Sequence, residues 1–219
     1  MARINDYKQE RNYENLQKAM FPGVGEYDIP ALKPVTEINV ENWLPFNYAR
    51  TRAHPEKDGV HFFLDDYQFE RVWKSPDKYT HLLSRFAAVC TPDFSPYSDF
   101  PKAVQIFNHY KKHWCGAYWQ SKGITVIPTI TWSSPETLEW AFDGEPVGGI
   151  VATSAVGMFD TNEHIYWLLD GYKEMIEWLK PTKILWKGKV PSDLEADVKS
   201  GLICPIASHV DRWRGPKGE

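Results

Sequence analysis

The sequence predicts an α/β domain built on a mostly parallel β-sheet. Short apolar runs, such as residues 60–64 and 149–154, alternate with longer segments whose apolar residues recur every three or four positions. Caps, prolines and glycines separate the two kinds of segment. Because strand–helix–strand crossovers in one sheet are right-handed, this alternation places the strands parallel. We expect a TIM-barrel-like or partial-barrel arrangement, with an open doubly wound sheet as the alternative.

The chain is predicted to have an N-terminal arm over residues 1–25, a single α/β domain over residues 26–207 and a loose C-terminal tail over residues 208–219. The arm has enough spaced apolar residues for a weak amphipathic helix, and a docked arm and a frayed tail fit it equally well. Prolines and glycines then interrupt residues 21–59, which predicts turns and short extended segments at 31–35 and 43–48. Proline inside both segments favours positions at a sheet edge.

The remaining elements follow in a regular order. Strands are expected at 60–64, 87–91, 124–132, 149–154, 183–186 and 202–206. Two helices are expected to begin at a serine cap followed by proline, Ser75-Pro76 and Ser134-Pro135. A long helix follows Pro101 and places Ala103, Phe107, Tyr110, Trp114, Ala117 and Tyr118 on its core face. Another runs from Asn162 to Pro181, and a short one lies near 193–198.

Composition restricts the function classes. At 219 residues the chain fits one ordinary domain, and its net charge of −4 argues against generic nucleic-acid binding, which needs a basic surface. The three cysteines are isolated, which is typical of reduced thiols in a cytosol. The sequence shows no apolar signal core and no run of membrane-spanning length. We therefore expect a soluble cytoplasmic protein without a membrane partner.

Carboxylates follow two of the expected strands. Ligands of parallel α/β sheets bind where strands end, at the carboxyl edge. Asp65 and Asp66 follow the strand at 60–64, and because they are adjacent on an extended chain only one faces a pocket. Asp93 follows the next strand and is expected to meet that carboxylate. These three are the candidate catalytic residues; helix capping and Asx-turns are the structural alternatives.

Such a pair supports more than one chemistry. Glycosyl transfer or hydrolysis uses one carboxyl group as acid and another as base or nucleophile, and a carboxylate pair also suits Mg²⁺. The cofactor is therefore unknown, with Mg²⁺ as a candidate. Further strand-end side chains are expected to contact the ligand, with the tryptophans stacking on it and the cations holding an anionic group: Gln68, Arg71, Ser95, Tyr97, Thr131, Trp132, Ser154, Trp186 and Lys187.

Other motifs are weak or absent. His109 and His113 lie four residues apart, but no third residue has metal-ligand spacing, so we expect surface or half-buried histidines and no metal centre. The sequence lacks Gly-x-Ser-x-Gly, His-Glu-x-x-His and Gly-x-Gly-x-x-Gly. The absence of these motifs argues against three common enzyme classes: serine hydrolases with Gly-x-Ser-x-Gly, zinc peptidases and dinucleotide-binding oxidoreductases.

Four segments carry a resemblance to a known family. They are FFLDDYQFERVW at 62–73, TPDFS at 91–95, GAYWQ at 116–120 and VIPT at 126–129. Together they resemble a domain-of-unknown-function family, number forty-four seventeen of its series, that is common in bacteriophages, plasmids and Gram-positive bacteria. The resemblance covers about residues 26–188. It implies a phage or mobile-element setting, and hence a bacterial host cytoplasm, but brings no activity, cofactor or catalytic residue.

Three functions are compatible with these observations. The first is a carboxylate-dependent hydrolase or glycosyl-transfer enzyme acting on a nucleotide or sugar-like small molecule. The second is a non-catalytic protein that sequesters a nucleotide or blocks a host defence protein, which the aromatic content of 15% and the mobile-element setting favour. The third is a replication-associated nucleic-acid binder, which the acidic balance disfavours.

Overall fold

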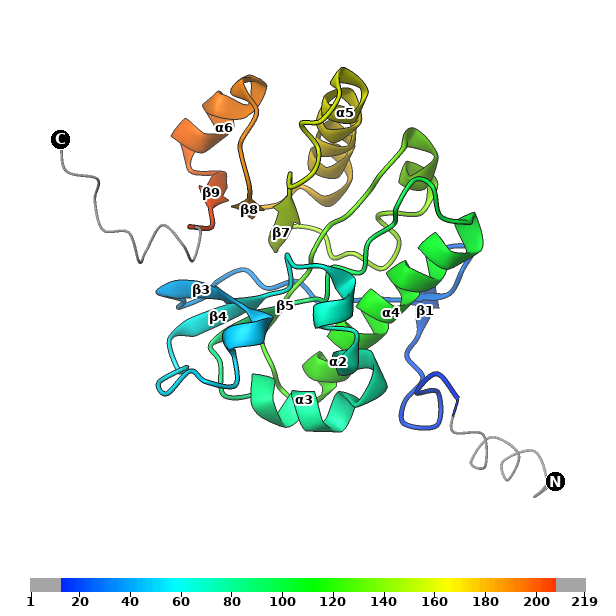
Figure 1. The fold of residues 1–219 in the computed structure, drawn as a ribbon, viewed down its shortest axis with the longest axis vertical. Coiled ribbons are helices and arrows are strands. Elements are labelled where there is room, and N and C mark those ends of the chain that lie inside the picture. Colours follow the sequence, from blue (N-terminus) through cyan, green and yellow to red (C-terminus); the bar gives the residue numbers. More distant parts are fainter. Residues whose placement is uncertain (1–12, 208–219) are drawn as a thin grey trace.

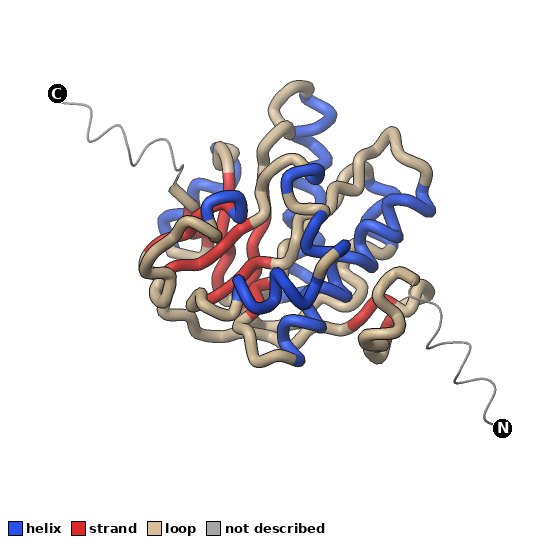
Figure 2. The backbone as a smooth tube through the Cα atoms, turned by 60° about the horizontal axis from the view of Figure 1, so that its bottom comes forward, coloured by secondary structure: helices blue, strands red, loops and turns tan. Residues whose placement is uncertain are grey.

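The computed structural model describes residues 13–207, so predictions for residues 1–12 and for the C-terminal tail lie outside the described residues. It shows a mixed α/β fold in which the strands lie between two groups of helices (Figure 1). Figure 2 shows most of the strands, in red, gathered on one side of the long helices, with a short separate pair on the other side. No helix within residues 13–207 has the length and apolar character that crossing a membrane requires.

The strands form two main parallel sheets. One holds four strands in the order β3 (Asn42–Pro45), β4 (Asp58–His61), β5 (Ala88–Cys90) and β6 (Val126–Ile127). The other holds β7 (Ile150–Ser154), β8 (Lys183–Lys187) and β9 (Ile203–Pro205). All neighbours in both sheets pair in parallel, as the sequence predicts. Pro45 lies in β3, an edge strand, where a missing N–H donor is tolerated.

Strand order follows chain order through both sheets. A parallel bridge between Thr129 and Ala152 connects the end of the first sheet to the second. A doubly wound sheet would instead reverse its order near the middle, so that alternative does not describe the chain. Within residues 13–207 no ladder joins β3 to β9, and the sheets therefore do not close into a barrel.

Helices occur close to where the sequence predicts them. They are α2 (Arg71–Lys74), α3 (Pro76–Leu83), α4 (Lys102–Ser121), α5 (Asn162–Leu179) and α6 (Glu195–Ser200). Short 3-10 helices are η1 (Phe46–Tyr48), η2 (Asp66–Gln68), η3 (Pro135–Glu139) and η4 (Ser192–Leu194). The Ser134-Pro135 start thus yields a 3-10 turn. Residues 31–35 form no strand, whereas β1 (Gly23–Val24) and β2 (Ile29–Pro30) form a small antiparallel pair.

The described part of the N-terminal arm is docked on the domain. The Asn15 side-chain amide donates to the Trp73 carbonyl at 2.7 Å, and the Trp73 indole N–H donates to Glu14 Oε2 at 2.9 Å. Trp73 is itself buried in the core that β4, β5, α3 and α4 share. Residues 14 and 15 are therefore tied to α2, in agreement with the docked alternative.

Both sheets are apolar on both faces. Val89 packs in the cluster under α3 and α4, while its neighbours Ala88 and Cys90 pack in a second cluster on the opposite face. That second cluster also receives Ile127 from β6 and Leu185 from β8, so it is shared by the two sheets. Burial on both faces explains why these strands read as continuous apolar runs rather than alternating ones.

Trp132 and Trp186 lie in the core between the second sheet and α5. The indole N–H groups donate to backbone carbonyls, at 3.0 Å for Trp132 and 3.1 Å for Trp186. Helix α5 approaches closely because it carries Gly171, where an added Cβ would lie 2.2 Å from Trp132 Nε1. A role for these indoles as stacking surfaces for substrate does not fit this placement.

We expect Gly171→Ala to destabilise the protein by about 1–3 kcal/mol, because the new methyl group must displace a tightly packed indole. The sign of this stability change is informative, because Gly→Ala inside an unhindered helix usually stabilises a protein by roughly 0.5–1 kcal/mol. Urea unfolding measures the change, with Glu177→Ala, an exposed position on the same helix, as the control. A stabilised Gly171→Ala protein would show that α5 does not pack on Trp132 in this way.

Candidate functional site

Helix α4 buries a polar stripe. The stripe repeats at helical spacing and consists of buried residues only: Gln105, Asn108, His109, Lys112 and His113. The apolar face expected to be core is buried only in the C-terminal half of the helix, at Trp114, Ala117 and Tyr118, whereas Phe107 is 39% exposed and Ala103 is also exposed. Buried polar groups need partners, and those of α4 find them in the loops beyond the strand ends.

The first part of the stripe fixes the loop after β5. The Gln105 side-chain amide donates to the carbonyls of Tyr97 and Phe100, at 2.9 and 2.8 Å. The Asn108 amide donates to the Ser95 carbonyl at 2.8 Å. These bonds satisfy carbonyls of a segment that has no regular secondary structure, and they hold that loop against α4.

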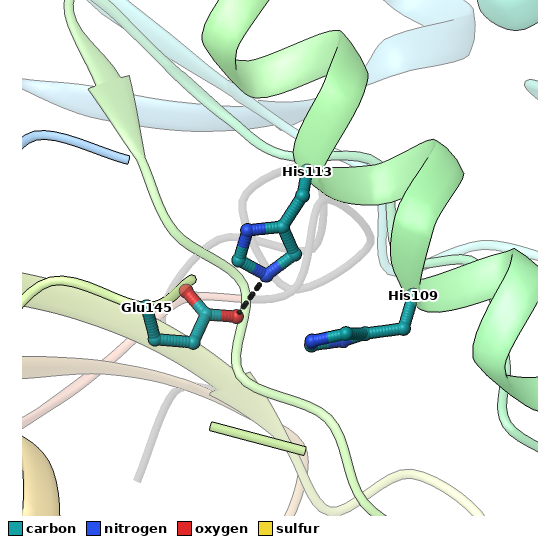
Figure 3. Close-up of side chains that lie close together, drawn as sticks. All are labelled: His109, His113 and Glu145. Carbon is teal, nitrogen blue, oxygen red and sulfur yellow. Dashed lines mark hydrogen bonds and ion pairs between the residues drawn. The ribbon is translucent and has the colours of Figure 1, made fainter. Parts of the chain in front are cut away.

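The second part of the stripe surrounds a buried carboxylate. Glu145 Oε1 accepts from Lys112 Nζ at 2.7 Å and lies 2.9 Å from His113 Nε2 (Figure 3). Lys112 Nζ also donates to the Thr129 carbonyl at 2.9 Å, and His113 Nδ1 lies 2.9 Å from the Pro30 carbonyl. Burial opposes ionisation of Glu145, but the charges and hydrogen bonds of Lys112 and His113 outweigh it and lower its pKa. The carboxylate is therefore ionised in the protein interior.

His109 completes this group. It lies one helical turn before His113, with ring centroids 4.4 Å apart, and its Nε2 lies 3.0 Å from the Asp143 carbonyl. Burial, together with the charges of Lys112 and His113, lowers the pKa of His109 well below its usual value. Both histidines are thus buried rather than surface or half-buried, and a third group meets them. The sequence could not indicate Glu145, because it lies 32 residues beyond His113 in a loop.

Asp66 and Asp93 also come together at this edge of the first sheet. Asp66 accepts two hydrogen bonds from Ser95, from the backbone N–H at 3.1 Å and from Oγ at 2.9 Å, which join the loops after β4 and β5. The Asp93 carboxyl is near enough for the charge of Asp66 to raise its pKa. Oδ1 of Asp93 is buried, without a hydrogen-bond partner among the described residues.

Burial sets the ionisation of both carboxyl groups. Removal from water, followed by the charge of Asp66, raises the pKa of Asp93 to about 7, although the Lys112 ammonium opposes the shift. Burial also raises the pKa of Asp66, against the lowering effect of the Ser95 hydrogen bonds and the Lys111 charge. Lys112 therefore connects the cluster around Glu145 with the aspartate pair, because its ammonium group binds Glu145 and its charge lowers the pKa of Asp93.

The other predicted residues from the first sheet have local contacts. Asp65 is exposed and accepts from the Gln68 amide at 3.1 Å, so it is not joined to Ser95 as Asp66 is. The Arg71 guanidinium lies over the Phe46 ring, 5.0 Å from its centroid, on the helical side of the sheet. Tyr97 is exposed.

The predicted residues from later strand ends are dispersed along the edge. Ser154 ends β7, where its Oγ accepts from the Val156 N–H at 3.2 Å, and Lys187 ends β8 and is half-buried. Thr131, beyond β6, is half-buried. Of the candidates named from sequence, hydrogen bonds join Asp66 to Ser95 and Asp65 to Gln68, and Asp93 is related to Asp66 by the effect of the Asp66 charge on its pKa.

The fold and site define an α/β protein with sequentially ordered parallel strands and a buried polar centre where they end. The chain belongs to the family described as "Domain of unknown function (DUF4417)", which it matches over residues 21–204. It is 40% identical over 172 residues to the "Gene 1 protein" of Mycobacterium phage L5, covering 78% of this chain and 75% of that protein.

A second relative is the "Gene 1 protein" of Mycobacterium phage D29, 39% identical over 172 residues and 78% of this chain. The shared region spans 63% of the D29 protein, less than two thirds of its length. No solved structure matches the chain. The family therefore has bacteriophage members, in agreement with the resemblance read from residues 62–129.

We expect Asp93 to make folding stability depend on pH. Between about pH 4 and pH 7 the unfolded chain has released the Asp93 proton while the folded protein retains it, so stability falls as pH rises through this window. A shift of about three pH units corresponds to about 4 kcal/mol. The difference in unfolding free energy, Asp93→Asn minus wild type, should therefore increase by about 3–4 kcal/mol as the pH rises from 4 to 8.

Urea unfolding at a series of pH values measures this difference. Asp99→Asn, at an exposed carboxylate in the same loop, is the control variant. A difference between Asp93→Asn and wild type that stays constant with pH would show that Asp93 titrates normally.

Proposed function

We propose that this protein is an acid–base enzyme, a hydrolase or glycosyl-transfer enzyme of bacteriophage association, acting on a nucleotide or sugar-like substrate in a bacterial host cytoplasm. Asp93 is the general acid and Asp66 the base or nucleophile. The observation that carries the proposal is the buried Oδ1 of Asp93, which has no hydrogen-bond partner within residues 13–207 although the charge of a second carboxyl group, Asp66, acts on it.

The two carboxyl groups have different surroundings. Asp93, with a pKa raised to about 7, retains its proton in a large part of the molecules at neutral pH and is able to donate it to a leaving group. Burial raises the pKa of Asp66 as well, but the two hydrogen bonds from Ser95 and the charge of Lys111 oppose that rise and favour its ionised form. Two carboxyl groups whose environments separate their pKa values are the pattern of an acid and a base in one site.

A hollow beside Lys111 is the proposed binding position of the substrate. It has a volume of about 370 Å³ and is lined by residues of the N-terminal arm, α2 and α4: Glu14, Asn15, Glu70, Trp73, Lys74, Phe107 and Lys111. Such a volume is within the range of small-ligand sites. Asp66 and Asp93 are not among these lining residues, but the charge of Lys111 lowers the pKa of Asp66, and its ammonium group suits an anionic substituent in the hollow.

The strand order supports a partial-barrel interpretation of the fold. Parallel strands that follow chain order, with ligand-binding groups at their carboxyl ends, are the arrangement in which (β/α) barrels carry their active sites. The central side chains of the proposed site come from the loops after β4 and β5, so they meet this positional rule.

We expect Asp93→Asn to lower turnover by about 10²–10⁴-fold, because an amide cannot donate the acid proton. Turnover in wild type should also decline above about pH 7, where Asp93 loses that proton. The measurement is hydrolysis of chromogenic glycosides, nucleosides and nucleotides by the purified full chain, with Asp99→Asn as control.

Full activity of a folded Asp93→Asn protein would exclude Asp93 as the acid. Tight binding of a nucleotide without turnover would support the sequestering function instead. A shift of labelled nucleic acid at physiological salt would support the replication-associated binder.

A further inference from the structure

We propose that His109, His113 and Glu145 bind a divalent transition-metal ion, with zinc as the ion that best suits two imidazoles and a carboxylate. This centre is separate from the Asp66–Asp93 pair and does not depend on the function proposed for it. Three observations support it. The ligand atoms converge, the second ring nitrogen of each histidine is hydrogen-bonded to a backbone carbonyl, and one oxygen of Glu145 is buried without a hydrogen-bond partner among the described residues.

The three side chains converge. One nitrogen of each histidine and one Glu145 oxygen lie within 4.8 Å of one another. His109 and His113 share a face of α4 because they are four residues apart, and both rings reach toward Glu145 in Figure 3. Metal–ligand bonds of about 2.0–2.2 Å need ligand atoms roughly 3.3 Å apart, so small side-chain rotations close the site.

Each histidine has its second nitrogen fixed by a backbone carbonyl. His109 donates Nε2–H to Asp143, and His113 donates Nδ1–H to Pro30, since a carbonyl can only accept. His109 Nδ1 and His113 Nε2 are then the nitrogens available as ligands. A hydrogen bond from the non-ligating N–H to a carbonyl is the usual support of a metal-binding histidine, because it fixes tautomer and ring orientation.

Only one of the two carboxylate oxygens of Glu145 has hydrogen-bond partners among the described residues. Both Lys112 Nζ and His113 Nε2 meet Oε1, while Oε2 is buried without a hydrogen-bond partner among the described residues. A carboxylate has about four acceptor positions, and leaving one oxygen unsatisfied in the interior is costly. In addition, His113 Nε2 and Glu145 Oε1 need a proton or a metal ion between them: without metal, a protonated His113 donates Nε2–H to Oε1, and a bound metal ion would replace that proton.

In the absence of metal, Lys112 stabilises the buried charge of Glu145. Its ammonium group neutralises Glu145 and also donates to the Thr129 carbonyl at 2.9 Å. A dication on Glu145 repels this ammonium, which retains Thr129 as a partner when it moves away. A purely structural ion-pair network uses these same contacts, so the decisive observation is metal uptake. Three protein ligands leave the fourth position of a tetrahedral zinc ion for a water molecule.

The test is metal uptake by the full chain after dialysis against a chelator. We expect one equivalent of Zn²⁺ per chain by elemental analysis, and Co²⁺ as a spectroscopic substitute with visible absorption bands. The variants are His109→Gln, His113→Asn and Glu145→Gln. In the first two the new amide reproduces the donor to Asp143 or Pro30 and removes the ligand nitrogen.

Each variant should weaken binding by more than about 100-fold, the upper limit for loss of an outer-shell partner alone. His54→Ala and His81→Ala, at exposed histidines, should bind as wild type does. Less than one tenth of an equivalent in wild type, or unchanged binding in folded His109→Gln and His113→Asn, would overturn the proposal.

A second measurement needs no variant. Long-range ¹H–¹⁵N NMR of the wild-type imidazoles, recorded during Zn²⁺ addition, should show coordination shifts at His109 Nδ1 and His113 Nε2. Shifts confined to other histidines would identify an adventitious surface site and contradict the proposal.

Discussion

The ion pair between Lys112 and Glu145 is the constraint on which the centre of this molecule depends. Both side chains are at most 1% exposed. Removing one partner of a buried pair typically costs about 3–5 kcal/mol, because the other charge remains in a medium that cannot solvate it. The pair therefore fixes where the loop containing Glu145 meets α4. His113 extends the same constraint to the Pro30 carbonyl and so to the N-terminal segment.

The polar stripe of α4 relates stability to the proposed function. Its amides hold the loop after β5, and that loop carries Ser95 and Asp93. Lys112 then acts both on Glu145 and on the charge of Asp93. An apolar interior would favour stability, but this protein buries charged groups near the strand ends. It also buries a carboxyl oxygen of Asp93 that has no hydrogen-bond partner in the described part of the chain. Such departures are expected at functional sites rather than in purely structural interiors.

The sequence indicated the architecture well because its signals were local. Apolar runs bounded by turns marked β4, β5, β7 and β8, and the parallel pairing followed from alternation with helices. The meeting of Asp66 with the Ser95 loop followed from the rule that neighbouring parallel strands end at one edge. The polar stripe was missed because periodicity assigns the polar face of a helix to solvent, although five polar residues at i, i+3, i+4, i+7 and i+8 were visible. Glu145 and the core positions of Trp132 and Trp186 depend on tertiary packing, which no local pattern encodes.

A double-mutant cycle on Lys112→Met and Glu145→Gln tests the central claim most directly. Unfolding free energies of wild type, both single variants and the double variant give the coupling between the two side chains. We predict that each single change is strongly destabilising and that the double variant recovers at least about 2 kcal/mol relative to the sum, as expected for groups in direct contact. Additive effects within about 0.5 kcal/mol would contradict the account, because they would show that the two charges do not depend on each other.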